Sequence, residues 1–564
     1  DTKAVYLDGA GSGAAVVDAF ASLSVVDLKV QDDLTVTDDL IVNGDIDLEG
    51  SIDVNGTANL DVVDIDGAVD MATTLAVAGN VDFNGGLDVD GTTNLDVVDI
   101  DGAVDMSGNL TMSGSALIRT TDGTESTPGL RIGVDNDTGL YRPTANTIGF
   151  VTTGAERFRI AADGALSTPT SGTSNFRAGV NAGNSIASGG NYNVVVGDEA
   201  GTALTTGDNN VAIGFEALKT EDANGDNTAV GFQALKTLNA GADGDNVAVG
   251  SQAGLSITTG TQNNIIGSQA GDALTEGGSN VAIGRLALSS DTLGSRSTAL
   301  GHATLVTQNF TTATDTYNVA VGYAAGTAIT TGAFNTLIGG LAGDALNTPN
   351  SNVAVGYSAL SGDTKGAKSV AVGVSTLLAQ NLTTATDVFN TAIGHNAGKA
   401  ITTGVQNTLI GGLAGDSLTD ADFNTAVGYT SLGSDTLGSR STAIGYAALT
   451  AQNFTTATNA YNVGVGHAAG SSITTGTLNS IIGGLAGRAL TTGEANTVVG
   501  YTALSADTLG KRSVAIGTKA LENQNFTTAT DVYNVAIGYD AGNDITTGIN
   551  NTLIGGLAGD ALTT

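Results

Sequence analysis

The chain has 564 residues, 81 of them glycine, only 13% charged, four proline and none cysteine or tryptophan. Glycine is therefore about double its usual ~7% share, and charge is about half of the usual ~25%. Disordered chains are rich in charge and poor in branched residues, and collagen needs glycine at every third position, so both classes are excluded. Repetitive β-structure is the class that remains.

Charge and hydropathy also limit the partners. With 56 acidic and 20 basic residues the formal net charge is −36. A nucleic-acid or anionic-membrane partner would need clustered Lys and Arg, and the sequence contains no such cluster. No apolar run approaches the ~18 residues of a membrane helix. We therefore expect no nucleic-acid partner and no membrane insertion.

Residues 34–118 follow a six-residue period, after an N-terminal segment (1–33) that we expect to attach the chain or continue this shaft. Leu34, Leu40 and Ile46 are six apart, and Gly44 and Gly50 mark the turns between them. Strand-and-turn units this short cannot form a core alone. We expect three chains wrapped about one axis, with a single-chain hexapeptide β-helix as the alternative.

The next two segments are not periodic. Residues 119–168 read as a small β-module of short strands joined by turns, and they hold five of the 20 basic residues. Residues 169–192 are rich in Ser, Gly and Asn, which is typical of a linker.

Residues 193–564 repeat the formula Asn-x-x-[Val/Ile]-Gly, with variants, 21 times between Gly197 and Gly555. The spacing is mostly 17, and from residue 246 it runs 17, 17, 17, 21, a superrepeat of 72 residues. Strand-forming Val-Ala-Val cores at this period predict a parallel β-solenoid with one coil per unit, stacked about 4.8 Å apart. We expect the array to continue past residue 564. The structural repeat is represented by these residues: Asn318, Gly322, Asn335, Gly339, Asn352 and Gly356.

Both faces of each strand are apolar, with Val319 and Val321 on one side and Ala320 on the other. We therefore expect one face inside the coil and the other against neighbouring chains, with the small alanines suited to close packing between chains. The leading asparagines are expected to form a hydrogen-bonded ladder, and the glycines to supply corners with positive φ.

The four-residue insertion in every fourth coil is the best functional candidate. It reads "NFTTATD" or a close variant, and it would repeat as evenly spaced bumps along one face. Exposed Phe side chains could stack on a sugar or a protein; the alternative is that Phe tucks over the coil edge. The candidate receptor contacts are Phe310, Leu382, Phe454, Phe526, Thr311, Thr383, Thr455 and Thr527.

Catalytic and metal chemistry is not indicated. His302, His395 and His467 each follow the formula glycine, in a slot that elsewhere holds Tyr, and they are several coils apart. "GGLAG", as at 339–343, has no lysine for a phosphate, which favours corner glycines over a nucleotide loop. Acidic stretches such as 61–67 and 135–139 do not complete a calcium loop, so a structural calcium ion is an unsupported alternative. We expect no enzymatic activity, no cofactor and no metal.

Several of these motifs resemble known families. "NVAIGFEAL" and "NTAVGYTSL" resemble the head repeats of trimeric autotransporter adhesins, which are trimeric left-handed β-rolls and also occur in bacteriophage tail fibres. "TGLYRPTANTIGFVTTGAERFRI" (138–160) and the hexad shaft are similar to segments of phage tail fibres. The coils here, of 17 and 21 residues, are longer than those usual in autotransporter heads.

The resemblance implies an elongated homotrimeric, all-β virion fibre that attaches to host cells. Its implied partners are two further copies of the chain, other tail or baseplate proteins, and a host receptor that is a polysaccharide or an outer-membrane protein. The alternatives are a bacterial trimeric adhesin at the cell surface and a purely structural extracellular filament.

Overall fold

The computed structural model describes residues 6–7, 16–17, 34–47, 53–58, 64–65, 68–69, 71, 74, 76–81, 120–132 and 135–564. The chain divides into two compact units, Asp1–Thr111 and Met112–Thr564. The described residues are all-β or irregular and contain no helix.

In the first unit, β1 (Tyr6–Leu7) pairs antiparallel with β2 (Val16–Val17). The described shaft residues form no strand, and their apolar side chains are exposed in the single chain, as Leu40 (62%) and Ile41 (79%) show. The remaining hexad positions, including all of those at 82–118, lie outside the described residues. The three-chain shaft and the single-chain β-helix therefore both stay predictions.

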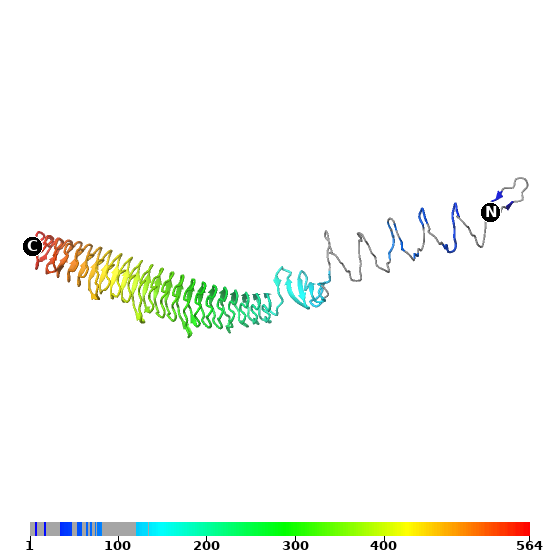
Figure 1. Ribbon diagram of the computed structural model, residues 1–564, viewed down its shortest axis with the longest axis horizontal. Helices are drawn as coiled ribbons and strands as arrows, with labels where there is room; N and C mark the ends of the chain where they lie inside the picture. Colours follow the sequence, from blue (N-terminus) through cyan, green and yellow to red (C-terminus); the bar gives the residue numbers. More distant parts are fainter. Residues whose placement is uncertain are drawn as a thin grey trace. The chain divides into compact units, whose positions relative to one another are not determined.

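The β-module segment (119–168) contains a five-stranded antiparallel sheet (Figure 1). Gly149 in the middle strand lacks a Cβ that would come within 2.3 Å of the Tyr141 ring. The absence of a side chain there lets the tyrosine lie flat across the sheet. The strands are β3 (Leu130–Arg131), β4 (Gly139–Tyr141), β5 (Ile148–Thr152), β6 (Ala155–Ile160) and β7 (Leu166–Ser167).

A parallel β-solenoid follows, which confirms the predicted class and the 17-residue coil (Figure 1). Consecutive strands pair in register; for example, Val319, Ala320 and Val321 lie beside Thr336, Leu337 and Ile338. The ladder strands are β8 (Phe176–Ala178), β9 (Val194–Val196), β10 (Val211–Ile213), β11 (Thr228–Val230), β12 (Val247–Val249), β13 (Asn264–Ile266), β14 (Val281–Ile283), β16 (Thr298–Leu300), β18 (Val319–Val321), β19 (Thr336–Ile338), β20 (Val353–Val355), β22 (Val370–Val372), β24 (Thr391–Ile393), β25 (Thr408–Ile410), β26 (Thr425–Val427), β28 (Thr442–Ile444), β30 (Val463–Val465), β31 (Ser480–Ile482), β32 (Thr497–Val499), β34 (Val514–Ile516), β36 (Val535–Ile537) and β37 (Thr552–Ile554).

The solenoid starts one coil earlier than the sequence formula indicates. β8 pairs in parallel with β9, the Asn175 side chain is buried, and Gly179 occupies the corner position with φ 131°. The segment 169–192, which was expected as a linker, thus contains the first coil of the array.

The core runs through the interior of the coils. From β9 onward the central residue of each ladder strand points inward, so that Ala320, Leu337 and Ala354 are fully buried. Leu or Ile side chains from the turn after each corner, such as Ile329 and Leu346, fill the remaining space. The small alanines therefore pack inside one chain, and the expectation that they lie between chains is wrong. The branched residues of the strand form its outer face.

The corners are fixed by two ladders, one of glycine and one of asparagine. A Cβ on Gly339 would lie 2.5 Å from the carbonyl oxygen of Gly356 in the next coil, so only glycine fits. Asn335 donates its backbone N–H to Oδ1 of Asn318 at 2.9 Å, and Asn352 donates to Oδ1 of Asn335 at 3.0 Å. Coils that begin with Asn therefore fix the start of the next strand through a buried side-chain amide. In every superrepeat one coil begins with Ser instead, at Ser297, Ser369, Ser441 and Ser513, and its N–H still donates to the asparagine before it.

Candidate functional site: the insertion edge

Each of the four insertions adds a separate two-stranded sheet at one edge of the solenoid (Figure 1). Each consists of two parallel two-residue strands, one before and one within the insertion. The pairs are β15 (Gly294–Ser295) with β17 (Thr314–Asp315), β21 (Gly366–Ala367) with β23 (Thr386–Asp387), β27 (Gly438–Ser439) with β29 (Thr458–Asn459), and β33 (Gly510–Lys511) with β35 (Thr530–Asp531).

The large apolar residue near the start of each insertion is buried. Phe310, Leu382, Phe454 and Phe526 are only 7%, 6%, 5% and 7% exposed. These side chains cover the coil edge. The structure therefore agrees with the alternative in which Phe folds back onto the coil, and not with an exposed Phe. The threonines that follow them, Thr311, Thr383, Thr455 and Thr527, are exposed.

A buried polar network holds each insertion in place. Asp291 is fully buried, and its Oδ1 accepts hydrogen bonds from the backbone N–H groups of Gly294 and Phe310, both at 3.1 Å. Gln308 donates its amide to Asp291 Oδ2 at 2.5 Å and to Ser297 Oγ at 2.9 Å, and its own oxygen accepts from Asn318 at 2.9 Å. The network therefore connects the insertion to the asparagine ladder.

The same network recurs at 72-residue intervals. Its acid and amide pairs are Asp291 with Gln308, Asp363 with Gln380, Asp435 with Gln452, and Asp507 with Gln524. Burial raises the pKa of the Asp507 carboxyl above its ordinary value, although the Gln524 amide and backbone N–H groups oppose this rise. All of the donors are neutral, so the network serves packing and register rather than acid–base exchange with a ligand.

A cation and an aromatic ring lie exposed beside each insertion. Arg296 forms an ion pair with Asp315, and its guanidinium lies 5.7 Å from the centre of the Tyr317 ring. The Phe334 ring stacks with Tyr317 at 5.9 Å between ring centres. Tyr317 and Phe334 are 50% and 55% exposed.

We call these groups the insertion-edge clusters. Counterparts with a cation over an aromatic ring follow at the superrepeat spacing: Lys368 over Phe389 with Asp387, Arg440 over Tyr461 with Asn459, and Arg512 over Tyr533 with Asp531. Sequence analysis missed them because the cation and the ring belong to different coils. The signal available was the recurrence of a cation at 296, 368, 440 and 512, always 72 apart.

The histidine slot is part of the stacked surface, whereas the GGLAG motif at 339–343 runs from the corner glycine Gly339 into the buried Ala342 and Gly343. His302 stacks on Tyr323 and His467 stacks on Tyr446, with ring centres 5.6 and 5.2 Å apart. Over the residues that the structure describes, no three His, Cys, Asp or Glu side chains group to hold a metal. In the DNDTG turn, Asp135 accepts from Asp137 N–H and Thr138 Oγ at 3.1 and 2.7 Å, while most of 61–67 and all of 96–102 lie outside the described residues.

Comparison with known proteins finds no matching protein family, no matching curated protein and no matching solved structure. In the described portion of the chain, no helix has the length and hydrophobicity to cross a membrane.

Proposed function

We propose that the chain is a subunit of a homotrimeric virion tail fibre that attaches to a host-cell receptor. The observation that carries this proposal is the outer face of the ladder. The second and fourth residues of the repeat formula point out of the coil, and branched apolar side chains at the fourth position, such as Ile338 (39%), Ile410 (37%) and Ile482 (43%), are exposed in the single chain.

This exposure is too regular to be incidental. A soluble protein rarely exposes a contiguous apolar surface larger than a few hundred Å² unless a partner covers it. Here the same outward position is filled by Val, Ile or Leu in nearly every coil. Identical faces on identical chains can cover one another by closing around a symmetry axis, and three chains are the number that we propose.

The insertion edge supports the adhesive part of the proposal. It presents exposed threonines, aromatic rings and cations once every four coils, about 19 Å apart at the stacking distance of β-strands. Such repetition suits a receptor that binds at many points along the fibre, because several linked weak contacts give a higher overall affinity than one contact alone. The receptor class that we propose is a surface polysaccharide or outer-membrane protein.

Trimerisation is tested by the mass of the purified chain in sedimentation equilibrium. We expect about 167 kDa, three times the chain mass of 55.6 kDa. The triple variant Ile338→Asp, Ile410→Asp and Ile482→Asp should lower this mass, whereas the control Thr331→Asp, Thr403→Asp and Thr475→Asp, at exposed corner positions, should not. A monomer in the unaltered protein at all concentrations contradicts the proposal.

Attachment is tested by adsorption of particles to host cells. Removing the TTAT segments at 311–314, 383–386, 455–458 and 527–530, whose first three residues are exposed, should reduce adsorption while the trimer mass is retained. Unchanged adsorption would remove the insertions from the receptor site. Immuno-electron microscopy that finds the chain on cell envelopes and never on tailed particles would favour the surface adhesin over the virion fibre.

A further inference from the structure

One face of the five-stranded sheet in the β-module is made of apolar side chains. Directly opposed residues of antiparallel strands lie on the same face, and so do residues two apart along one strand. One row of opposed residues crosses β3, β4, β5 and β6, and a second row crosses β5, β6 and β7. The two rows, which we call the apolar sheet face, consist of Leu130, Leu140, Phe150 and Phe158, and of Ile148, Ile160 and Leu166.

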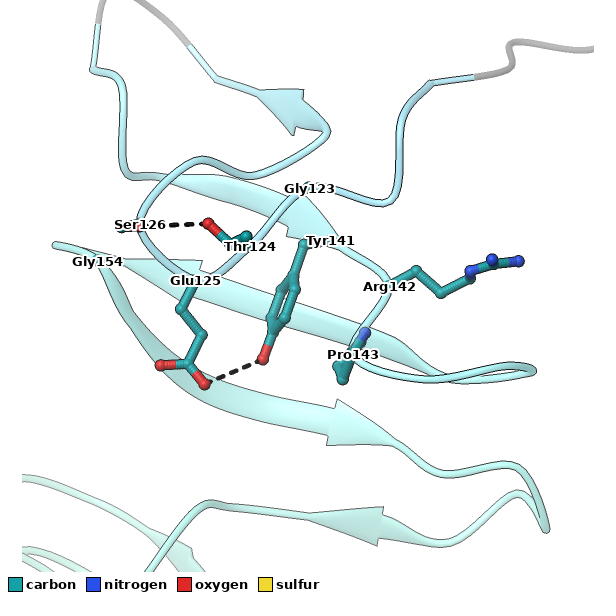
Figure 2. A pocket seen from close by; sticks show the side chains of 8 residues that line it. All are labelled: Gly123, Thr124, Glu125, Ser126, Tyr141, Arg142, Pro143 and Gly154. Atoms are coloured by element: carbon teal, nitrogen blue, oxygen red, sulfur yellow. Dashed lines mark hydrogen bonds between the residues drawn. The ribbon is translucent and has the colours of Figure 1, made fainter.

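The opposite face of the sheet is the one that the chain itself covers. Tyr141 and Val151 lie on that side and are 8% and 2% exposed. The turn at 123–126 lies over the tyrosine, and Figure 2 shows the Glu125 side chain directed at the Tyr141 hydroxyl, with 3.3 Å between the two oxygens. This side also holds Glu156, which is buried and forms an ion pair with Arg159. The sheet therefore has one polar, covered side and one apolar side.

The apolar sheet face is open in the described single chain. Four of its residues are more than one third exposed, namely Leu130 (43%), Ile148 (48%), Phe150 (39%) and Leu166 (56%). The other three are half-buried. Single exposed apolar residues are common on protein surfaces, but a contiguous apolar face of a sheet is normally packed against another layer. The exposure therefore indicates that a partner covers this side.

The distribution of charge favours a second copy of this chain as that partner. The net charge of −36 makes two copies repel one another, so a contact between them requires surfaces without acidic groups. None of the seven residues of the apolar sheet face carries a charge. The acids Glu125 and Glu156 belong to the covered side instead. The apolar sheet face can therefore meet its own copy without bringing like charges together.

The composition of the face supports the same partner. Permanent interfaces between identical chains resemble a domain core cut in half, whereas transient contacts are about as polar as the rest of a protein surface. The seven side chains contain no hydrogen-bonding group that would orient a foreign ligand. Rotation of identical chains about one axis also brings each segment level with its own copies. When solenoids associate in this way, each β-module meets the β-modules of its neighbours.

We propose that the apolar sheet face is an interface between copies of this chain, in which the β-modules pack together through Phe150 and its neighbours. The inference rests on the proposed homotrimer, but the contact that it adds is separate from the outer face of the solenoid ladder. The β-module thereby joins the chains at a point in the sequence before the solenoid begins.

The experiment is cysteine cross-linking of the full chain, which has no cysteine of its own. Phe150→Cys places a thiol on the apolar sheet face, and the matched control Ser126→Cys places one in the exposed turn on the covered side. A bifunctional maleimide that spans about 10 Å, the separation of packed sheets, should link Phe150→Cys into a covalent dimer. This dimer should have about 111 kDa, twice the chain mass of 55.6 kDa, and Ser126→Cys should form none. A monofunctional maleimide should label Phe150→Cys at least tenfold more slowly than Ser126→Cys.

The outcomes separate this inference from the proposed fibre. If the chain sediments as a trimer but Phe150→Cys forms no more dimer than Ser126→Cys, the homotrimer stands and the sheet interface is wrong. Slow labelling of Phe150→Cys without cross-linking also overturns the inference, because something other than a second copy then covers the face. A chain that is monomeric at every concentration contradicts both proposals. Circular dichroism checks that the variants are folded, and Ile148→Cys, on the same face, repeats the test if Phe150→Cys is not.

Discussion

The Asp435 carboxylate accepts a hydrogen bond from the backbone N–H of Phe454 at 3.1 Å, although the two residues are 19 positions apart. The contact joins one coil to the insertion of the next, and both residues are buried. The carboxylate also accepts from Gly438 N–H at 3.0 Å and from the Gln452 amide at 2.6 Å. One side chain thus satisfies three donors that the insertion would otherwise leave buried without partners.

Replacing Asp435 by alanine should therefore loosen this insertion. A buried donor left without a partner costs about 1–3 kcal/mol. We expect faster amide hydrogen exchange at 452–458, with the equivalent insertion at 380–386 unchanged as an internal control. Asp420→Ala, at an exposed position, should leave both segments as they are. Equal exchange in the two variants would contradict a structural role for the network.

Phe454 and Thr455 are adjacent but should behave oppositely. Phe454 is 5% exposed and covers the coil edge, so Phe454→Ala should destabilise the insertion by about 3–5 kcal/mol. Thr455 is exposed, and Thr455→Ala should cost no more than about 0.5 kcal/mol. Limited proteolysis at 453–459 measures the difference. If host adsorption is lost in Thr455→Ala and its three equivalents while proteolysis is unchanged, the threonines act in binding and not in folding.

Acid should loosen the first coils of the solenoid through Glu216. Lys219 and Lys236 each lie 2.7 Å from its carboxylate oxygens and, with Gln233, lower its pKa to about 2. Because the pKa of Glu216 is lower in the folded chain than its ordinary value of 4.5, the ionised carboxylate stabilises the fold at pH values above 4.5. This contribution is lost as the pH falls towards 2. The ion pairs are partly exposed, so the effect should be about 1 kcal/mol or less.

The measurement is hydrogen exchange at 211–236 between pH 5 and pH 2, corrected for the intrinsic pH dependence of exchange. Glu216→Gln should remove the extra acid sensitivity of this segment. The control Glu276→Gln, in a later coil, should leave it intact. An acid response of 211–236 that is the same in both variants would show that Glu216 does not carry it.

The repeat spacing predicted the solenoid but not which residues lie inside it. Both faces of a strand such as 319–321 are apolar, so alternation alone could not decide whether Ala320 or Val321 points inward. The first coil was missed because Ala178 replaces the Val or Ile of the formula before Gly179. In both cases the sequence pattern is ambiguous or altered at a single position. The parallel pairing of β8 with β9 shows that the first coil is nevertheless formed.

The candidate sites were less predictable because they depend on distant residues. The buried position of Phe310 is held by a hydrogen bond from its backbone N–H to Asp291 in the preceding coil. No feature of the insertion sequence itself indicates this contact. The Tyr141 hydroxyl contacts Glu125 and Glu156, which are 16 and 15 positions away, and only the fold of the β-module brings the three together. Sequence periodicity identifies equivalent residues of successive repeats that stack on one another. A site built from residues of different types can be located only when the three-dimensional path of the chain is known.

Two adjacent glycines provide the sharpest test of the coil geometry. Gly411 has φ 134°, and a Cβ there would lie 2.6 Å from the carbonyl oxygen of Gly428. Because that obstacle is backbone, Gly411→Ala must displace the neighbouring coil, and we expect a loss of about 3 kcal/mol or more in the stability of this region. At Gly412 the nearest obstacle to a Cβ is the Tyr429 ring at 3.5 Å, an ordinary contact, so Gly412→Ala should change stability by no more than about 0.5 kcal/mol. Hydrogen exchange at 408–428 compares the two variants directly. If Gly411→Ala exchanged no faster than Gly412→Ala, the corner glycines would not be required by the close approach of successive coils, and the stacking register described here would be incorrect at this position.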